Sequence, residues 1–242
     1  MSIQVQHISK RFGTYEAVDD VSLDVASGDD GDLTFAPPFG DLPRGLVHRV
    51  VGEFTYEYDA RAFFQAHAGL VADLQREVCG RARGEVAVDL YAGVGLFTLP
   101  LARRYQRVIA VESDRVAARL LQRNARSNRC ANVEVAPTSA ESWAKAIPSG
   151  VDRIVVDPPR TGLPRPVRRT LVEARIPRLT YASCHPATLA RDLRDLGAAY
   201  RVESLALLDM FPQTGHIEMV VDLVPSEAPP RLTPPDGAAA RQ

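Results

Sequence analysis

The sequence predicts an α/β protein with a doubly wound, mostly parallel sheet, and three observations support this. From Glu85 onward, short runs rich in Val, Ile and Leu alternate with stretches of helical periodicity. Several of these runs end directly in a glycine loop, a proline or an acidic residue, which marks the end of a buried strand. The last two apolar stretches, 202–210 and 216–224, predict an antiparallel pair that completes a mixed sheet.

Residues 1–28 predict two strands joined by a turn, because apolar and polar residues alternate around Val5 and again around Leu23. This segment resembles the first strands of ABC-transporter ATPases, in which an aromatic residue placed like Tyr15 stacks on adenine. In that family a phosphate-binding GxxxxGK[ST] loop follows within about ten residues. Here Gly28 is followed by DDGDLTFAPPFGD, and the motif is absent from the chain. We therefore interpret 1–28 as a fused fragment, and ATPase activity as the least supported alternative.

The remaining elements follow in order. The Asp-, Gly- and Pro-rich segment 29–45 is typical of a linker, and 46–58 has the β-branched and aromatic residues of one or two strands. A helix is expected over Ala62–Cys79. The Pro- and Ala-rich tail, 225–242, is predicted to be disordered. Between Cys79 and this tail, we expect strands at 85–90, 107–113, 132–137, 152–157 and 178–184. We expect helices at 95–104, 114–127, 141–146, after Pro166 and at 187–196.

Composition places the chain among ordinary soluble proteins. Of its 242 residues 45% are hydrophobic and 24% charged, which suffices for one good-sized domain with an appendage. The sequence contains neither a run near the ~20 apolar residues of a membrane helix nor a signal peptide at its start, so we expect a cytoplasmic monomer. The three cysteines (Cys79, Cys130 and Cys184) form no metal-type spacing, which argues against a metal or iron–sulfur site.

The net charge of −1 gives no global signature of nucleic-acid binding, but arginine is unevenly distributed. Arg115, Arg119 and Arg123 recur every four residues and therefore share one face of the predicted helix. That face could follow a line of phosphates, or it could be an ordinary solvated helix surface. The sequence leaves both interpretations open.

A cofactor site is predicted where the first strands of the doubly wound unit end. Tyr91, Gly93 and Gly95 follow the first strand, and the two glycines allow a ligand to approach the backbone closely. Glu112 ends the second strand, where a carboxylate can bind both hydroxyls of an adenosine ribose. The third glycine of a dinucleotide-binding motif is missing from GVGLFT. S-adenosylmethionine, which has no pyrophosphate, fits this pattern better than a dinucleotide.

The fourth strand ends in Asp157-Pro158-Pro159-Arg160. Two prolines stop the strand sharply and direct Asp157 into the cleft. Enzymes that methylate amino groups usually have an aromatic residue in the last position of such a tetrapeptide. Arg160 is not aromatic, so methylation of nitrogen is disfavoured.

Cys184 follows the fifth strand and precedes a helix N-terminus, whose partial positive charge favours a thiolate. Carbon 5 of a pyrimidine is a poor nucleophile, but a thiolate that adds to carbon 6 converts the ring into an enolate that can attack a methyl sulfonium. A base must then remove the carbon-5 proton, and Glu218 lies on the strand expected to return beside the cleft. By contrast, we expect Cys79 and Cys130 to be ordinary core residues.

Five segments together resemble the RNA (uracil-5-)-methyltransferases, a family of class I, Rossmann-like S-adenosylmethionine-dependent enzymes. They occur in the family's order over about residues 46–224. The cysteine- and glutamate-containing segments are the most specific. The segments are AFFQAHAGL (62–70), DLYAGVGLFTLPLA, DPPRTGL, YASCHPATLARDL and DMFPQTGHIEMV.

The resemblance implies a role for each matching residue. Cys184 would be the nucleophile and Glu218 the base, acting on a uridine of ribosomal or transfer RNA. Gln65, Tyr91, Gly93, Gly95, Glu112 and Asp157 would bind S-adenosylmethionine, and Phe63, Asp157 and Arg160 would contact the uracil. The related cytosine-5 enzymes carry a second cysteine in the loop where this chain has 157–160, so the pattern favours uracil.

The sequence departs from the family at His67 and His185, which replace asparagines, and at Leu96, which replaces a polar residue. Residues 1–45 also leave no room for the family's N-terminal RNA-binding barrel or its iron–sulfur insert. An alternative is therefore a catalytically impaired module that binds S-adenosylmethionine but engages RNA weakly.

Overall fold

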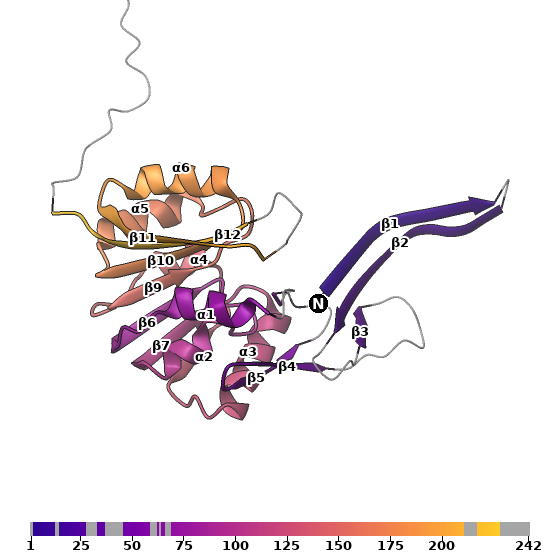
Figure 1. The fold of residues 1–242 in the computed structure, drawn as a ribbon, viewed down its shortest axis with the longest axis horizontal. Helices are drawn as coiled ribbons and strands as arrows, with labels where there is room; N and C mark the ends of the chain where they lie inside the picture. Colours follow the sequence, from indigo (N-terminus) through magenta and orange to yellow (C-terminus); the bar gives the residue numbers. More distant parts are fainter. Residues whose placement is uncertain are drawn as a thin grey trace, which may run out of the picture.

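A seven-stranded sheet forms the centre of the structure (Figure 1). Its strands are β6 (Gly84–Leu90), β7 (Tyr105–Val111), β8 (Val133–Ala136), β9 (Arg153–Val156), β10 (Arg178–Ser183), β11 (Tyr200–Leu208) and β12 (Glu218–Pro225). Their order across the sheet is β11-β12-β10-β9-β6-β7-β8. Strands β6 to β10 are parallel, whereas β12 is antiparallel to both of its neighbours. This confirms the predicted mixed, doubly wound sheet.

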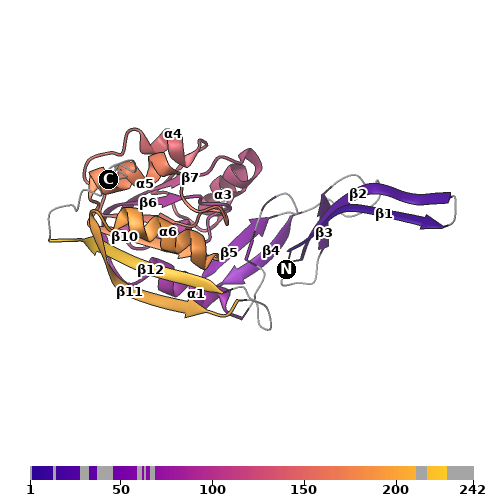
Figure 2. The same cartoon turned by 90° about the horizontal axis from the view of Figure 1, so that it is seen from above.

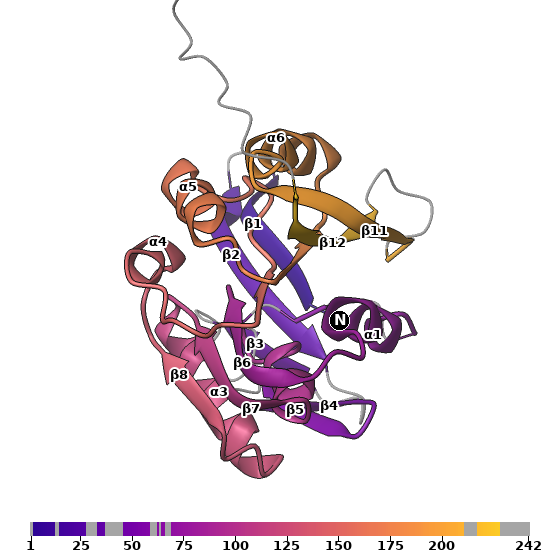
Figure 3. The same ribbon diagram turned by 90° about the vertical axis from the view of Figure 1, so that its left-hand side faces the viewer.

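Helices cover both faces of the sheet. One face is covered by α1 (Val71–Cys79), α2 (Thr98–Ala102) and α3 (Arg115–Ser127), and the other by α4 (Ala140–Ala144), α5 (Arg165–Ala174) and α6 (Pro186–Leu196). Figure 3 shows α4, α5 and α6 along one side of the strands and α1 on the opposite side. Because successive strand residues point to opposite faces, Val155 joins the first core, whereas Ile154 and Val156 join the second. None of the described helices is long and apolar enough to span a bilayer.

The segment 46–58 forms a hairpin of β4 (Val47–Val51) and β5 (Phe54–Tyr58), as predicted. The helix expected over Ala62–Cys79 instead begins only at Val71. Tertiary contacts explain the difference, because the ring of Phe64 stacks on Tyr58 at 4.7 Å. In addition, Arg49 donates a 3.0 Å hydrogen bond to the carbonyl oxygen of Gln65. These contacts with the hairpin replace the hydrogen bonds of a first helical turn.

The N-terminal segment forms a separate three-stranded antiparallel sheet (Figure 2). Its strands β1 (Ser2–Phe12) and β2 (Tyr15–Ser27) confirm the predicted pair, and β3 (Leu33–Ala36) lies within the segment expected to be a linker. The computed structural model describes residues 2–12, 15–27, 33–36, 46–58, 62, 64–65, 69–210 and 217–227, with the backbone alone for 2–36.

A buried arginine joins α1 to the sheet. The Arg153 side chain is 1% exposed, and its guanidinium donates to the carbonyl oxygens of Val78 (2.6 Å) and Cys79 (2.7 Å). It also donates to the hydroxyl of Thr180, and lies 3.5 Å from the carboxylate of Asp222. The last turn of a helix leaves carbonyl oxygens without partners. Arg153 therefore satisfies the end of α1 inside the core.

We expect Arg153→Met to lower the free energy of unfolding by about 3 kcal/mol, because it leaves the carbonyl oxygens of Val78 and Cys79 without a buried partner and removes one of the two cations beside Asp222. Urea denaturation measures this. Arg107→Met is the matched control, since the Arg107–Glu134 pair is half exposed and its loss should cost less than about 1 kcal/mol. Equal losses in the two variants would contradict a structural role for Arg153.

Candidate functional site

Three parallel strands bring their C-terminal ends together at one edge of the sheet. Leu90, at the end of β6, pairs with Val111 of β7 and with Val156 of β9. Parallel strands in register end side by side, so the next residue of each strand lies at the same edge. These next residues are Tyr91, Glu112 and Asp157. The register thus gathers three residues that are far apart in sequence.

Antiparallel pairing brings the two proposed catalytic residues to the same edge. Ser183, at the end of β10, pairs with Met219 of β12. Continuing this register by one residue sets Cys184 beside Glu218, which is the first residue of β12. In agreement, the charge of Glu218 affects the ionisation of both Cys184 and Asp157.

These residues line one cavity of about 750 Å³. That volume is in the range of cavities that hold cofactor-sized ligands. Eight predicted site residues line it: Gln65, Tyr91, Gly93, Glu112, Asp157, Arg160, Cys184 and Glu218. Cys184 and Glu218 thus share one cavity with the residues predicted to bind the cofactor, whereas their roles stay predictions.

The glycine loop after β6 is held in a left-handed conformation. Tyr91 has φ +64° and Gly93 has φ +54°, and a Cβ atom on Gly93 would meet no protein atom within 4 Å. The amide of Gly93 donates to a carboxylate oxygen of Glu112 at 2.8 Å, and the amide of Asp114 donates to the other at 2.7 Å. These two bonds orient the Glu112 carboxylate, whose remaining lone pairs can accept hydrogen bonds from a ligand.

One predicted residue that the structure describes lies outside the cavity wall. Gly95 is not among the residues that line the cavity, so its assignment to cofactor binding stays a prediction. Gly95 has φ +100°, and a Cβ there would lie 3.3 Å from the side chain of Leu121, so this glycine allows the loop to pack closely against α3. Phe63 lies outside the described residues, as does His67. The neighbouring Phe64 does line the cavity.

The cavity wall includes Gln65, whose amide oxygen has no partner among the described residues. The hydroxyl of Tyr91 also has none, but burial and the charges of Glu141 and Asp192, which do not line the cavity, raise its pKa. Gln65 is only 5% exposed, and a buried polar atom without a hydrogen bond is costly. Such atoms fit a ligand that supplies hydrogen bonds, as the amino, carboxyl and ribose groups of S-adenosylmethionine would.

The electrostatics of the cavity favour a cation. Burial raises the pKa of Glu218 to about 7. Burial and the nearby Glu218 raise the pKa of Asp157 well above its usual range. Directly below the glycine loop, burial also raises the pKa of Asp89 to about 7, although Thr98 donates a 2.5 Å hydrogen bond to its carboxylate. A sulfonium or ammonium group would relieve the mutual repulsion of these carboxylates.

The thiol of Cys184 is less acidic than the sequence suggested. We expected the N-terminus of α6 to favour the thiolate, but burial raises the thiol pKa, and the charges of Glu218 and Asp157 raise it further. The positive charge of Arg160 opposes this. Burial and the two carboxylates together outweigh Arg160, so added positive charge in the cavity would favour ionisation of the thiol.

Sequence reasoning missed the apolar wall and the residues that hold it. Phe64 and Phe97 line the cavity, as does Leu96, noted earlier only as a departure from the family. The carbonyl oxygen of Leu96 accepts hydrogen bonds from Tyr56 (3.1 Å) and Gln75 (2.9 Å). The sequence contained no sign that Phe64, Leu96 and Phe97 line a cavity, since isolated apolar residues usually belong to the core.

The fully buried side-chain amide of Asn124 holds the glycine loop in place. Asn124 of α3 donates to the carbonyl oxygens of Val94 and Glu57, both at 3.0 Å, and accepts from the amide of Glu57 at 2.8 Å. The β4–β5 hairpin and the glycine loop are therefore held by the same side chain. This arrangement keeps the hairpin, which leads to Phe64 and Gln65, beside the cofactor residues.

The sequence profile described as tRNA (uracil-5-)-methyltransferase matches residues 48–225. The chain belongs to this family. The match covers the β4–β5 hairpin and the entire seven-stranded sheet, and therefore every residue of the cavity. Among the described residues of this family member, no cluster of three or more His, Cys, Asp or Glu side chains could hold a metal ion.

Individual members of the family show the same similarity. An uncharacterized RNA methyltransferase of Synechocystis sp. is 36% identical over 185 residues, which are 74% of this chain and 40% of the relative. The 23S rRNA (uracil(1939)-C(5))-methyltransferase of Edwardsiella ictaluri is 37% identical over 193 residues, which are 72% of this chain and 43% of the relative. The chain thus spans about two-fifths of the length of these curated relatives.

A solved structure shows the family's fold directly. The crystal structure of Pyrococcus abyssi tRNA (uracil-54, C5)-methyltransferase in complex with S-adenosyl-L-homocysteine superposes with a TM-score of 0.71 at 27% identity. The superposition covers 84% of this chain and 59% of that one. The expected class I methyltransferase fold is therefore confirmed.

The raised pKa of Glu218 predicts a pH-dependent stability. Because the folded state favours the protonated carboxyl, the cost of burying its charge appears as the pH rises through about 7 and is absent near pH 4. Glu218→Gln should therefore raise the free energy of unfolding by up to about 3 kcal/mol at pH 8, and by much less at pH 5. Urea denaturation at both pH values measures this. The exposed Glu85→Gln should show no such difference, and equal stabilities of Glu218→Gln and wild type at pH 8 would contradict the prediction.

Proposed function

We propose that this chain transfers a methyl group from S-adenosylmethionine to carbon 5 of a uridine in transfer or ribosomal RNA, through a covalent bond between Cys184 and the uracil. The observation that carries the proposal is the position of Cys184 and Glu218 beside each other, in the same cavity as the glycine loop and Glu112. A cysteine and a carboxyl at this spacing supply both groups that carbon-5 methylation needs.

The cavity residues divide between the parts of the cofactor. Glu112, held by the amides of Gly93 and Asp114, would accept hydrogen bonds from the ribose. Gln65 and Tyr91 would bind polar groups of the methionine part, and Asp157 would lie between cofactor and uracil. When bound, S-adenosylmethionine supplies an electrophilic methyl group and a positive charge among the carboxylates.

The reaction begins at Cys184. Its thiol loses a proton to solvent, and the thiolate sulfur bonds to carbon 6 of the uracil, so that the electron pair of the carbon 5–carbon 6 double bond moves toward the oxygen on carbon 4. The resulting enolate makes carbon 5 nucleophilic. Carbon 5 then takes the methyl group, whose bonding electron pair remains with the donor sulfur.

Glu218 completes the reaction. Its carboxylate removes the proton from carbon 5, the electron pair of that C–H bond restores the double bond, and the Cys184 thiolate leaves carbon 6. A pKa of about 7 suits a general base at neutral pH, because the ionised fraction and the proton affinity are then both substantial. Since the uracil must reach the cavity, the uridine has to be turned out of any base stack.

The related proteins support transfer or ribosomal RNA as the substrate class, because their names specify uridines of both. The competing hypothesis is a module that binds S-adenosylmethionine without effective methylation, consistent with a chain that spans about two-fifths of its curated relatives. Calorimetry with S-adenosylmethionine together with tritium release from RNA labelled at uridine carbon 5 distinguishes the two. Binding without tritium release favours the module.

Cys184→Ala should lower tritium release at least about 10³-fold, because no other described residue of the cavity can add to carbon 6. Calorimetry should show S-adenosylmethionine binding within about threefold of wild type. Cys79→Ala, which removes a thiol from the core on α1, serves as the control and should retain activity. Methylation by Cys184→Ala would refute the covalent mechanism.

Glu218→Gln should form the adduct but release it slowly, since an amide cannot take the carbon-5 proton. Labelled RNA should therefore remain attached to this variant in a denaturing gel, while wild type shows little adduct. Glu203→Gln on β11 is the control for loss of a carboxylate. Rapid turnover by Glu218→Gln would remove Glu218 from its role as base.

A further inference from the structure

The outer face of α3 carries arginines that the catalytic site does not use. Arg115, Arg119, Arg126 and Arg129 are exposed, and their side chains have no hydrogen-bonding or ion-pair partner among the residues the structure describes. Arg123, which the sequence grouped with them, instead forms an ion pair with Glu57 of β5. Four of the five arginines therefore remain available to a partner.

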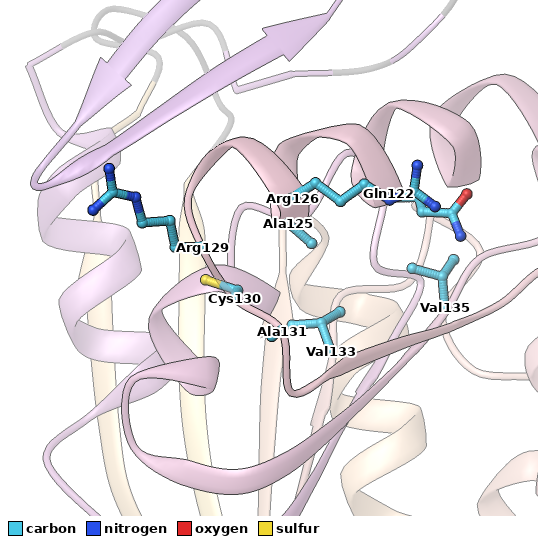
Figure 4. A pocket seen from close by; sticks show the side chains of 8 residues that line it. All are labelled: Gln122, Ala125, Arg126, Arg129, Cys130, Ala131, Val133 and Val135. Carbon is cyan, nitrogen blue, oxygen red and sulfur yellow. The ribbon is translucent and has the colours of Figure 1, made fainter.

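Arg126 and Arg129 border a groove between α3 and β8, which is an edge strand of the sheet. The groove has a volume of about 410 Å³ and opens to solvent. Figure 4 shows Gln122, Arg126 and Arg129 spread along it, above the side chains of Val133 and Val135. Its wall combines these polar side chains with an apolar part, in which Ala125 lies beside the two valines, and it contains no acidic residue among those described. We call this the α3–β8 groove.

Arg129 occupies a position that glycine usually takes. It follows Asn128, the C-cap of α3, and has φ +58°. Residues other than glycine seldom adopt this left-handed conformation just after a helix. The neighbouring loop is fixed, because Arg103 donates a 2.9 Å hydrogen bond to the carbonyl oxygen of Asn128. An arginine is thus held at the rim of the groove in spite of an unfavourable backbone conformation.

The helix connects this groove to the catalytic cavity. Ser113 lines the cavity, and α3 begins two residues later at Arg115. At 1.5 Å per residue, α3 spans about 18 Å from Arg115 to Ser127, and Arg129 lies just beyond its C-terminal end. The exposed arginines therefore extend from the cavity to the groove.

We propose that the exposed arginines of α3 and the α3–β8 groove bind the sugar–phosphate backbone of the RNA substrate beyond the target uridine. This rests on the proposed function. A polyanion is the partner that an arginine row without acidic residues fits, and the apolar wall of the groove can contact a sugar or base. Phosphate contacts position an RNA without reading its sequence. The chain, whose net charge is −1, would thus hold RNA through one local basic surface.

The test uses Arg126→Gln/Arg129→Gly in the full chain. At residue 129, glycine removes the guanidinium and suits the left-handed backbone, so the folded state should not be weakened there. Arg175→Gly is the control, because Arg175 is also an exposed arginine, with φ +45°, at the C-terminus of α5, although its guanidinium, unlike those of Arg126 and Arg129, donates to the carbonyl oxygen of Ser226. Thermal unfolding of all three proteins identifies any variant that is destabilised.

Binding is measured by fluorescence anisotropy with an unmodified transfer RNA transcript, without S-adenosylmethionine and at several salt concentrations. The double variant should raise Kd about 3- to 10-fold and lower the slope of log Kd against log salt by about one to two, whereas Arg175→Gly should change neither. In methylation assays, KM for RNA should rise while kcat stays constant. A fragment with fewer than about four nucleotides on either side of the uridine should show no difference between wild type and variant.

The two proposals fail in different ways. If wild type binds RNA and the variant binds it more weakly, but neither methylates it, the groove proposal stands and the proposed function falls. If wild type methylates RNA and the variant retains the same Kd, KM and salt slope, the arginines are a solvated surface and the groove proposal is overturned. Displacement of the RNA from wild type by polyglutamate at equal charge concentration would indicate an acidic protein as the partner, and would also overturn it.

Discussion

The direction of one strand determines whether this protein has a reaction site. Because β12 runs antiparallel to β10, its first residue, Glu218, lies beside Cys184 at the edge where the parallel strands end. A strand of eight residues is about 23 Å long from first to last, so a parallel β12 would carry the carboxyl to the opposite edge of the sheet. All other features of the site can be understood as support for that one adjacency.

Placing Glu218 beside Cys184 inside a buried cavity lowers the stability of the fold, because it buries carboxyl groups near one another. Burying Glu218 and Asp157 near each other raises both pKa values and that of the Cys184 thiol. An apolar cavity with excess carboxylates is unfavourable until it holds positive charge. A cationic methyl donor would therefore stabilise the fold and favour the thiolate together, and under the proposed mechanism this would couple cofactor binding to activation of Cys184. Active sites commonly sacrifice stability in this way.

The β4–β5 hairpin connects the N-terminal part of the matched region to the chemistry. Asn124 holds the hairpin to the glycine loop, and Arg49 holds the backbone of Gln65. The site is therefore assembled from the hairpin as well as from the sheet. Together with the proposed arginine surface of α3, the hairpin would extend the functional region beyond the strand ends that carry the proposed catalytic groups.

The sequence by itself determined the family and, from Glu85 onward, the order of strands and helices. Of the ten site residues that it predicted, eight line the cavity, because strand ends and their loops leave local signals such as DPPR and SCHP. It could not determine that Gly95 packs against α3, that the helix before Cys79 begins at Val71, or that the Cys184 thiol has a raised pKa. Each of these depends on contacts between residues distant in sequence. Local propensity contains no information about which side chains, or which charges, the tertiary structure will bring together.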